Sequence, residues 1–226
     1  MFYITGDIHG DPRDIVFFAL RHQDENIEGI IILGDVGANY YGNHKDDKVK
    51  AQLQQLGIPI ICIHGNHENR PQNIPTYQEK VWNGARCLYE PKYENLIFPI
   101  DGEVLKLGKK KCLVIGGAYS VDKWYRIRNC YAWWEDEQPS EETKKKVKKL
   151  FGRKFDYVFT HTCPEKFTPK EMFLPMIDQS TVDRSTEEWL DVVEEKIKYE
   201  KWFCGHWHTD KSVDKIQFLY NLFYKI

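Results

Sequence analysis

The sequence lacks the features that mark membrane-spanning, secreted and nucleic-acid-binding chains. Its longest apolar runs are far shorter than the ~20 residues that a transmembrane helix needs, so a soluble protein without a membrane partner is expected. The amino terminus has no basic segment followed by an apolar one, and no secretory signal is indicated. Lys and Arg number 32 and Asp and Glu number 34, which gives a formal net charge of -2. A general nucleic-acid footprint is therefore not indicated.

Cysteine pairs of the C-x-x-C type are also missing. The six cysteines stand apart, and several lie inside apolar runs typical of strands. They are expected to be buried thiols in a reducing compartment, which favours a cytoplasmic location. No stretch in the middle of the chain has the composition of a linker, so residues 1–226 are expected to form one domain.

One short turn, Gly65-Asn66-His67-Glu68, directly follows the apolar run 58–63. A short β-branched run that ends in such a turn predicts a buried strand with polar side chains at its carboxyl end, where an open α/β sheet binds its ligands. Asn66 offers an amide oxygen suited to a divalent cation, and His67 offers a proton that can move near neutral pH. An ordinary turn would look the same, so the meaning of this motif depends on the other strand ends.

Two earlier predicted strands end in the same way. Residues 2–5 precede Gly-Asp-Ile-His-Gly, in which Asp7 and His9 project to the same side if the extended chain continues. Residues 29–33 form a second apolar run, which closes on Asp35. Three buried strands separated by helical patterns indicate a largely parallel sheet. The first helix is expected to follow an N-cap at Asp11-Pro12, and the second to span about 45–56.

The second half of the chain predicts another sheet. The runs 95–100, 103–107 and 111–115 are joined by tight turns, which is typical of antiparallel strands. Further strands are predicted at 156–160, before His161, and at 201–204, before Gly205-His206-Trp207-His208. Between these two strands, residues 185–188 match a capping box. The helix that follows is expected to place one apolar face on Trp189, Val192, Val193 and Ile197.

Three segments each have two interpretations. The aromatic and basic residues between 124 and 134 either pack against their own loop or form a wall of a substrate site. The lysines at 144–149 form either a basic patch or the solvated face of a helix, because Glu141 and Glu142 precede them. Residues 164–185 contain three prolines and little periodicity, which predicts a loop or a lid.

The predicted strand ends carry more metal-competent side chains than a random globular sequence would place there. Each one alone has an ordinary explanation, since a single histidine is more often a packed or capping residue than a ligand. Five separate segments nevertheless each end an apolar run with such a side chain. The full set is Asp7, His9, Asp35, Asn66, His67, His161, His206 and His208.

At these positions the chain resembles the calcineurin-like metallophosphoesterases, and residues 116–123 look like those of bacterial and phage members. The signature series of that superfamily is present as Gly6-Asp7-Ile8-His9, Gly34-Asp35, Gly65-Asn66-His67-Glu68, His161 and Gly205-His206-Trp207-His208. The resemblance spans nearly the whole chain. It implies an α/β fold, a four-layer α-β-β-α sandwich with two mixed β-sheets.

The resemblance also implies a site for two metal ions. By motif, the first ion would be bound by Asp7, His9, Asp35 and His208, and the second by Asp35, Asn66, His161 and His206. Asp35 would bridge the two ions, and mixed nitrogen and oxygen ligands suit Mn, Fe or Zn. In such a site a hydroxide held by both ions attacks the phosphoester, while His67 donates a proton to the leaving oxygen.

The chain departs from the protein phosphatases of the superfamily at two places. These enzymes usually have Asp-Arg-Gly after the second motif and an arginine before Gly-Asn-His-Glu, where this chain has Ala38-Asn39-Tyr40 and His64. Activity on phosphoproteins is therefore in doubt. Other basic residues could bind the substrate phosphate if the fold brings them near, namely Arg70, Lys123, Arg126 and Arg128.

Three functions remain open from the sequence. The first is a metal-dependent hydrolase of phosphomonoesters or phosphodiesters, with a phosphorylated small molecule as substrate. The second is a nuclease that acts on single-stranded nucleic acid and stacks bases on the aromatic residues between 124 and 134. The third is a binding module without activity on the same fold, which would predict a degraded set of ligands.

Overall fold

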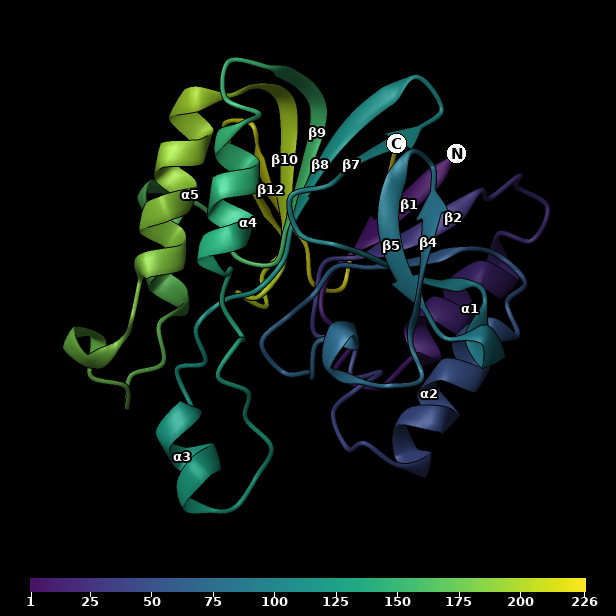
Figure 1. The fold of residues 1–226 in the computed structure, drawn as a ribbon, viewed down its shortest axis with the longest axis horizontal. Coiled ribbons are helices and arrows are strands. Elements are labelled where there is room, and N and C mark those ends of the chain that lie inside the picture. The colour runs from purple at the N-terminus through teal and green to yellow at the C-terminus, as the bar shows by residue number, and fades with distance from the viewer.

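Two β-sheets pack face to face and helices cover both outer faces in the computed structural model, which describes residues 1–226 (Figure 1). In Figure 1, α1 (Arg13–Arg21) and α2 (His44–Gln54) lie on the right, beside the first sheet. Helices α4 (Glu141–Lys148) and α5 (Ser185–Lys196) lie on the left, beside the second sheet. The four layers confirm the predicted α-β-β-α sandwich with two mixed sheets.

The first sheet has seven strands in the order β13-β1-β2-β3-β6-β5-β4. Strands β1, β2, β3 and β6 run parallel, whereas β13, β5 and β4 pair antiparallel with their neighbours. The parallel strands read as continuous apolar runs because both of their faces are covered. The strands are β1 (Phe2–Thr5), β2 (Gly29–Ile32), β3 (Ile60–Cys62), β4 (Gln78–Trp82), β5 (Ala85–Tyr89), β6 (Leu96–Pro99) and β13 (Tyr224–Lys225).

The second sheet has six strands in the order β11-β12-β10-β9-β8-β7. Its centre is parallel, from β8 through β9 and β10 to β12, and only the edge strands β7 and β11 pair antiparallel. The strands are β7 (Val104–Leu107), β8 (Lys110–Ile115), β9 (Lys154–Thr160), β10 (Lys198–Cys204), β11 (Lys211–Val213) and β12 (Ile216–Phe218).

The prediction that residues 95–100 begin an antiparallel second sheet is wrong. Strand β6 belongs to the first sheet, where Leu96 and Ile97 pair in parallel with Ile60 and Ile61. All four residues of β6 are buried, so its apolar run is continuous rather than alternating. A run of that kind is typical of a strand covered on both faces, which is the position that β6 occupies.

A hairpin that precedes β6 was not anticipated. Strands β4 and β5 are joined by Asn83 and Gly84, whose φ angles of 48° and 79° are both in the left-handed region. Asn-Gly is the residue pair that a type I′ hairpin turn favours. The two residues were therefore a usable signal in the sequence.

The helix at residues 185–196 forms without the predicted capping box. Helix α5 begins at Ser185, and the side chain of Asp183 accepts the hydrogen bond from the Ser185 N–H at 2.9 Å. Of the predicted apolar residues, Val193 and Ile197 are buried and Trp189 packs against the same core cluster, while Val192 is exposed and Leu190 is buried in addition. The cap therefore comes from the residue two positions before the helix, and the apolar face includes Leu190 in place of Val192.

The remaining elements are short. Helix α3 (Lys123–Arg128) occupies part of the segment predicted as an aromatic loop, and it projects below the sheets in Figure 1. Residues 164–185 contain three single-turn helices and no strand. The 3₁₀ turns are η1 (Pro71–Asn73), η2 (Pro91–Tyr93), η3 (Glu165–Phe167), η4 (Lys170–Met172) and η5 (Gln179–Thr181).

Apolar side chains fill the three spaces between the four layers. One cluster lies between the sheets and includes Ile31 and Phe203. A second lies between the second sheet and helices α4 and α5, and a third between the first sheet and helices α1 and α2. Five of the six free cysteines are buried as predicted, but Cys130, which follows α3, is exposed. None of the helices has the length and apolar character to cross a membrane.

Candidate metal centre

The carboxyl ends of five parallel strands meet at one edge of the sandwich. Strands β1, β2 and β3 supply side chains from the first sheet, and β9 and β10 supply them from the second. Because parallel strands end at the same edge, residues from distant parts of the chain come together there. The side chains that converge are Asp7, His9, Asp35, Asn66, His161, His206 and His208.

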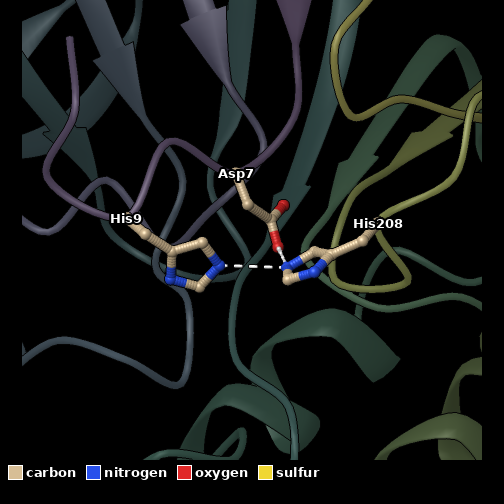
Figure 2. Close-up of side chains that lie close together, drawn as sticks. All are labelled: Asp7, His9 and His208. Carbon is tan, nitrogen blue, oxygen red and sulfur yellow. Dashed lines mark hydrogen bonds and ion pairs between the residues drawn. The ribbon is translucent and has the colours of Figure 1, made fainter. Parts of the chain in front are cut away.

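One group of donors consists of Asp7, His9 and His208 (Figure 2). The Nε2 atoms of the two histidines lie 3.0 Å apart, and His208 Nε2 lies 3.4 Å from Asp7 Oδ2. His9 Nε2 also lies 3.9 Å from Asp35 Oδ2, which links this group to the next one. All three side chains in Figure 2 point toward a common centre.

A second group of donors surrounds His161, whose side chain is fully buried. Its Nε2 atom lies 3.5 Å from Asp35 Oδ1 and 2.9 Å from Asn66 Oδ1. The ring of His206 stands 4.9 Å from the ring of His161, measured between centroids. Asp35 therefore lies between the two groups of donors, close to both His9 and His161.

The backbone at this edge is strained. Seven non-glycine residues in the chain have positive φ, and four of them are predicted ligands, with φ between 44° and 64°. Such conformations cost free energy and persist where the surrounding structure enforces them, which is most often at functional sites. The four residues are His9, Asp35, His206 and His208. The chain therefore turns sharply at His9, so it does not continue the extended form considered for Asp7 and His9, and it turns again at His208.

Hydrogen bonds from outside the donor groups orient the ligand atoms. The Nδ1 atom of His161 lies 2.7 Å from the carbonyl oxygen of Leu33, so the Nδ1–H donates there and the Nε2 lone pair faces the site. Asn66 donates its amide N–H to Ser120 Oγ at 2.9 Å, which turns Asn66 Oδ1 toward His161 Nε2 and the site. The first contact selects the tautomer of His161, and the second the orientation of the Asn66 amide, that can bind a cation at the site.

Two glycines allow the motifs to approach one another. A Cβ atom on Gly65 would lie 2.0 Å from Asp35 Oδ1, and a Cβ on Gly34 would lie 2.1 Å from His161 Nδ1. Gly34 also has a φ of 105°, which other residues rarely adopt. The glycines of the Gly-Asp and Gly-Asn motifs are thus required by packing between motifs, in addition to their local turns.

The titration of the site reflects its charges. Burial opposes ionisation of Asp35, but the adjacent His161 holds the pKa of Asp35 well below its ordinary value. Burial alone would lower the pKa of His161, yet the Asp35 carboxylate raises it to about 9. Contact with Asp7 raises the pKa of His208, and burial lowers the pKa of His206 well below the ordinary value. Bound cations would replace these protons and favour neutral imidazoles throughout.

The donor set fits metal ions. Carboxylate oxygens, imidazole nitrogens and one amide oxygen are ligands of Mn, Fe and Zn. The donor atoms of Asp7, His9 and His208 lie within 4.8 Å of one another, and so do those of Asp7, Asp35 and His161. Nitrogen lone pairs as close as those of His9 and His208 repel unless a proton or a cation lies between them. The buried donors already have outer hydrogen bonds of the kind that ligands of metals have in proteins.

His67 lies beside the donors and faces a cavity. Its backbone N–H donates to Asp35 Oδ1 at 2.8 Å, and its ring stands 5.3 Å from the ring of His9. The Nε2 atom lies 3.9 Å from Asp122 Oδ1, a buried oxygen without a hydrogen-bond partner. Burial lowers the pKa of His67. The cavity has a volume of about 330 Å³ and reaches from His67 and the metal donors to residues 165–184.

None of the predicted basic substrate ligands lines this cavity. Arg126 is buried, and it donates to the backbone carbonyl of Ala132 and to Ser120 Oγ. The Lys123 ammonium lies 4.2 Å from the centre of the Trp133 ring, and Arg128 is exposed on α3. Arg70 forms an ion pair with Asp101 at 2.7 Å in a separate, smaller cavity.

Several residues of the site were not singled out from the sequence. Ser120 orients Asn66, and Asp122 faces His67, yet the sequence drew attention to the segment 116–123 only for its likeness to bacterial and phage members and for Lys123. Phe173 and Arg184 line the cavity from the segment 164–185, which showed no periodicity, and Glu187 lines it from helix α5. For Ser120 and Asp122, their place in the loop that follows β8 was a usable signal, whereas Phe173 and Arg184 had none.

The carboxyl group of Glu187 should make the stability of the protein depend on pH. It is buried, accepts a hydrogen bond from Thr162 Oγ1 at 2.7 Å, and burial raises its pKa from 4.5 to about 7. The folded state therefore binds this proton more tightly than the unfolded state, so stability falls as pH rises from about 4.5 to about 7. Glu187→Gln should remove this loss. Its free energy of unfolding relative to that of wild type should therefore be higher at pH 8 than at pH 5, by on the order of 1–3 kcal/mol.

Urea unfolding of both proteins at pH 5 and pH 8 measures the effect of this substitution. The matched control is Glu188→Gln, because Glu188 is the next residue of α5 and is exposed. The free energy of unfolding of Glu188→Gln should differ from that of wild type by the same amount at both pH values. If the difference for Glu187→Gln were equally independent of pH, it would contradict the assignment of a raised pKa to Glu187.

Comparisons with known proteins agree with this architecture. No curated protein matches the chain. One solved crystal structure is 11% identical with a TM-score of 0.53, over 96% of this chain and 88% of its own. The crystal structure of TT1561 of Thermus thermophilus is 11% identical with a TM-score of 0.51, over 97% of this chain and 87% of its own. At this identity the likenesses show the fold alone.

The family comparison covers most of the chain. The model of the calcineurin-like phosphoesterases matches residues 1–210, which include every motif at the strand ends. Enzymes of this family hydrolyse phosphoesters with the help of bound metal, and the Asp and His groups described above could hold that metal. The chain belongs to the calcineurin-like phosphoesterase family.

Proposed function

We propose that this protein hydrolyses phosphomonoesters or phosphodiesters of small molecules at a site for two metal ions, Mn, Fe or Zn. Asp7, His9, Asp35 and His208 would hold one ion, and Asp35, Asn66, His161 and His206 the other. The observation that supports this most is the position of Asp35, whose two oxygens lie near His9 and His161, one in each group of donors. When bound, such ions polarise the phosphoryl oxygens and activate water.

The charge of the site suits an anionic substrate. Two divalent ions would face only the two carboxylates of Asp7 and Asp35, since the imidazoles and Asn66 are neutral as ligands. The excess positive charge then attracts a phosphate group without help from arginine side chains. This accounts for a phosphoesterase site whose surroundings lack Asp-Arg-Gly after the second motif.

His67 is proposed to donate a proton to the leaving oxygen. Its ring faces the cavity, and the carboxylate of Asp122 lies 3.9 Å from Nε2. A phosphoester anion beside His67 favours its imidazolium form, although burial alone lowers its pKa. The imidazolium can then pass a proton to the departing alkoxide or phenolate. Asp122 would act as a positioning residue for this ring.

The rival functions receive less support from the structure. Arg184 is the only lysine or arginine that lines the cavity, and it forms an ion pair with Glu165 at 2.7 Å. A nucleic-acid strand would need further cations along its backbone. A binding module would not need the complete donor set or His67.

The six free cysteines suit a reducing compartment, so the proposal includes a cytoplasmic location.

Hydrolysis of p-nitrophenyl phosphate and of bis-p-nitrophenyl phosphate tests the proposal. Chelator-treated protein should be inactive on both esters, and addition of Mn, Fe or Zn should restore hydrolysis of at least one because the ions activate water. The preferred ester then distinguishes monoesterase from diesterase. Activity that survives complete metal removal would overturn the proposal, and so would inactivity toward both esters in protein that elemental analysis shows to be loaded.

A further inference from the structure

The cavity beside His67 has two ends of different chemistry. One end carries the metal donors His9, Asp35 and His206, and the other is formed by residues 165–184 with apolar side chains. Its volume of about 330 Å³ exceeds what a phosphate group alone would fill and lies in the range of sites for small organic ligands. The far end therefore has room for the group that is esterified to the phosphate.

Aromatic rings connect the far end to the metal donors. Trp207 stands between His206 and His208 in the sequence, and its ring lies 5.3 Å from the ring of His206. The ring of Phe173 lies 5.9 Å from that of Trp207 at an angle of 33°. Met172 and Ile177 extend the same wall. A substrate whose phosphate is at the metal donors would thus have its ester group against this wall, defined here as the aromatic wall of Phe173 and Trp207.

Polar contacts hold the aromatic wall in place. Trp207 donates its indole N–H to Thr162 Oγ1 at 3.2 Å. Arg184 pairs with Glu165 at 2.7 Å, which joins the two ends of the segment that carries Phe173, and its guanidinium lies 5.4 Å from the Phe173 ring centre. Both rings are only partly buried, and Trp207 also packs against the apolar cluster between the second sheet and helices α4 and α5.

The charges at the far end disfavour an anionic ester group. Arg184 is already paired with Glu165 and also donates to Gln179 at 3.3 Å. The carboxyl groups of Asp183 and Glu187 line the same end. A second phosphate or a carboxylate would meet these acidic groups without a free cation to pair with it.

We propose that the group esterified to the substrate phosphate is an uncharged aromatic ring, which binds against the aromatic wall of Phe173 and Trp207. This inference rests on the proposed function, because it requires the phosphate to bind at the metal donors. Flat rings pack on a tilted pair of aromatic side chains with more contact than a flexible alkyl chain has. The substrate class is therefore an aryl phosphoester or one with an aromatic ring close to the ester oxygen.

Phosphonates that cannot be hydrolysed test this inference without interference from leaving-group chemistry. Inhibition constants of methylphosphonate, 2-aminoethylphosphonate and 1-naphthylphosphonate are measured on Mn-loaded protein, by competition with p-nitrophenyl phosphate and by calorimetry. The naphthyl compound should bind roughly tenfold or more tightly than the methyl compound because its ring packs on Phe173 and Trp207. The aminoethyl compound should bind no better than the methyl compound.

Variants of the segment show which side chain is responsible. Phe173→Ala should reduce the naphthyl preference to about threefold or less while the methylphosphonate constant stays unchanged, and Phe173→Leu should fall between. Met176→Ala is the matched control, because Met176 is 95% exposed on the same segment and does not line the cavity. It should retain the full preference.

The possible failures are distinguishable. Three results would overturn the aromatic ester group if the protein still hydrolyses a p-nitrophenyl ester. They are equal affinity for the methyl and naphthyl compounds, tighter binding of the aminoethyl compound, and a naphthyl preference that survives Phe173→Ala. Each would leave the proposed phosphoesterase activity intact. Metal-loaded protein that hydrolyses neither p-nitrophenyl ester and binds none of the phosphonates would contradict the proposed function itself.

Discussion

Asp35→Asn is expected to reduce binding of both metal ions and to abolish most of the hydrolytic activity. Asp35 lies between the two groups of donors, with Oδ2 3.9 Å from His9 Nε2 and Oδ1 3.5 Å from His161 Nε2. An asparagine has nearly the same shape and can still accept the His67 N–H, but its amide carries no negative charge and bridges two cations poorly.

Elemental analysis after loading with Mn measures this loss, together with circular dichroism to show that the variant is folded. Asp24→Asn is the matched control, since Asp24 is exposed and distant in sequence from every strand-end motif. It should bind metal as wild type does. Unchanged metal content in Asp35→Asn would refute the bridging role and would leave two separate sites or a single ion as the alternatives.

His67→Ala is expected to keep its metal and to lose activity on substrates whose leaving group needs a proton. The loss should reach about 10²- to 10⁴-fold in kcat for phenyl phosphate, because general acid catalysis contributes on that scale. It should be smaller for p-nitrophenyl phosphate, since p-nitrophenolate is a stable anion and leaves without protonation. The ratio of the two losses distinguishes an acid from a residue that only shapes the cavity.

The control for this substitution is His44→Ala, which removes an exposed histidine at the start of α2. Its kcat on both esters should equal that of wild type. A variant His67→Ala that contains less metal than wild type would instead place His67 among the ligands. Equal losses on phenyl and p-nitrophenyl phosphate would contradict proton donation to the leaving oxygen.

The predicted sheet positions follow from hydrophobic patterns that are short and continuous. Residues 29–33 and 58–63 are apolar at nearly every position. This pattern is typical of a short strand that is covered on both faces, and β2 and β3 lie in the centre of the first sheet. The same pattern at residues 95–100 was instead interpreted as antiparallel. The error arose because neighbouring turns, at Asp101-Gly102 and beyond, suggested hairpins, while the pairing partner of β6 lies 36 positions earlier, in β3.

The side chains proposed to bind metal were predictable as a group because a parallel sheet brings the ends of its strands together. The distances between their donor atoms could not be predicted, because these distances depend on how the two sheets pack and on sharp turns such as those at His9 and His208. The same limit applies to Arg126. Its position beside the aromatic segment suggested contact with substrate, whereas the fold buries its guanidinium against Ser120 and Ala132.

The sequence by itself determined the class of fold, the family and the side chains available to bind metal, because these depend on local patterns and on motifs at strand ends. Only the tertiary structure decided which residues line the cavity beside these side chains. Phe173 and Arg184 come from a segment without periodicity, and Trp207 is separated from Phe173 by more than 30 positions. Such contacts form when the two sheets pack and residues 165–184 lie against the strand ends, and no local pattern encodes them.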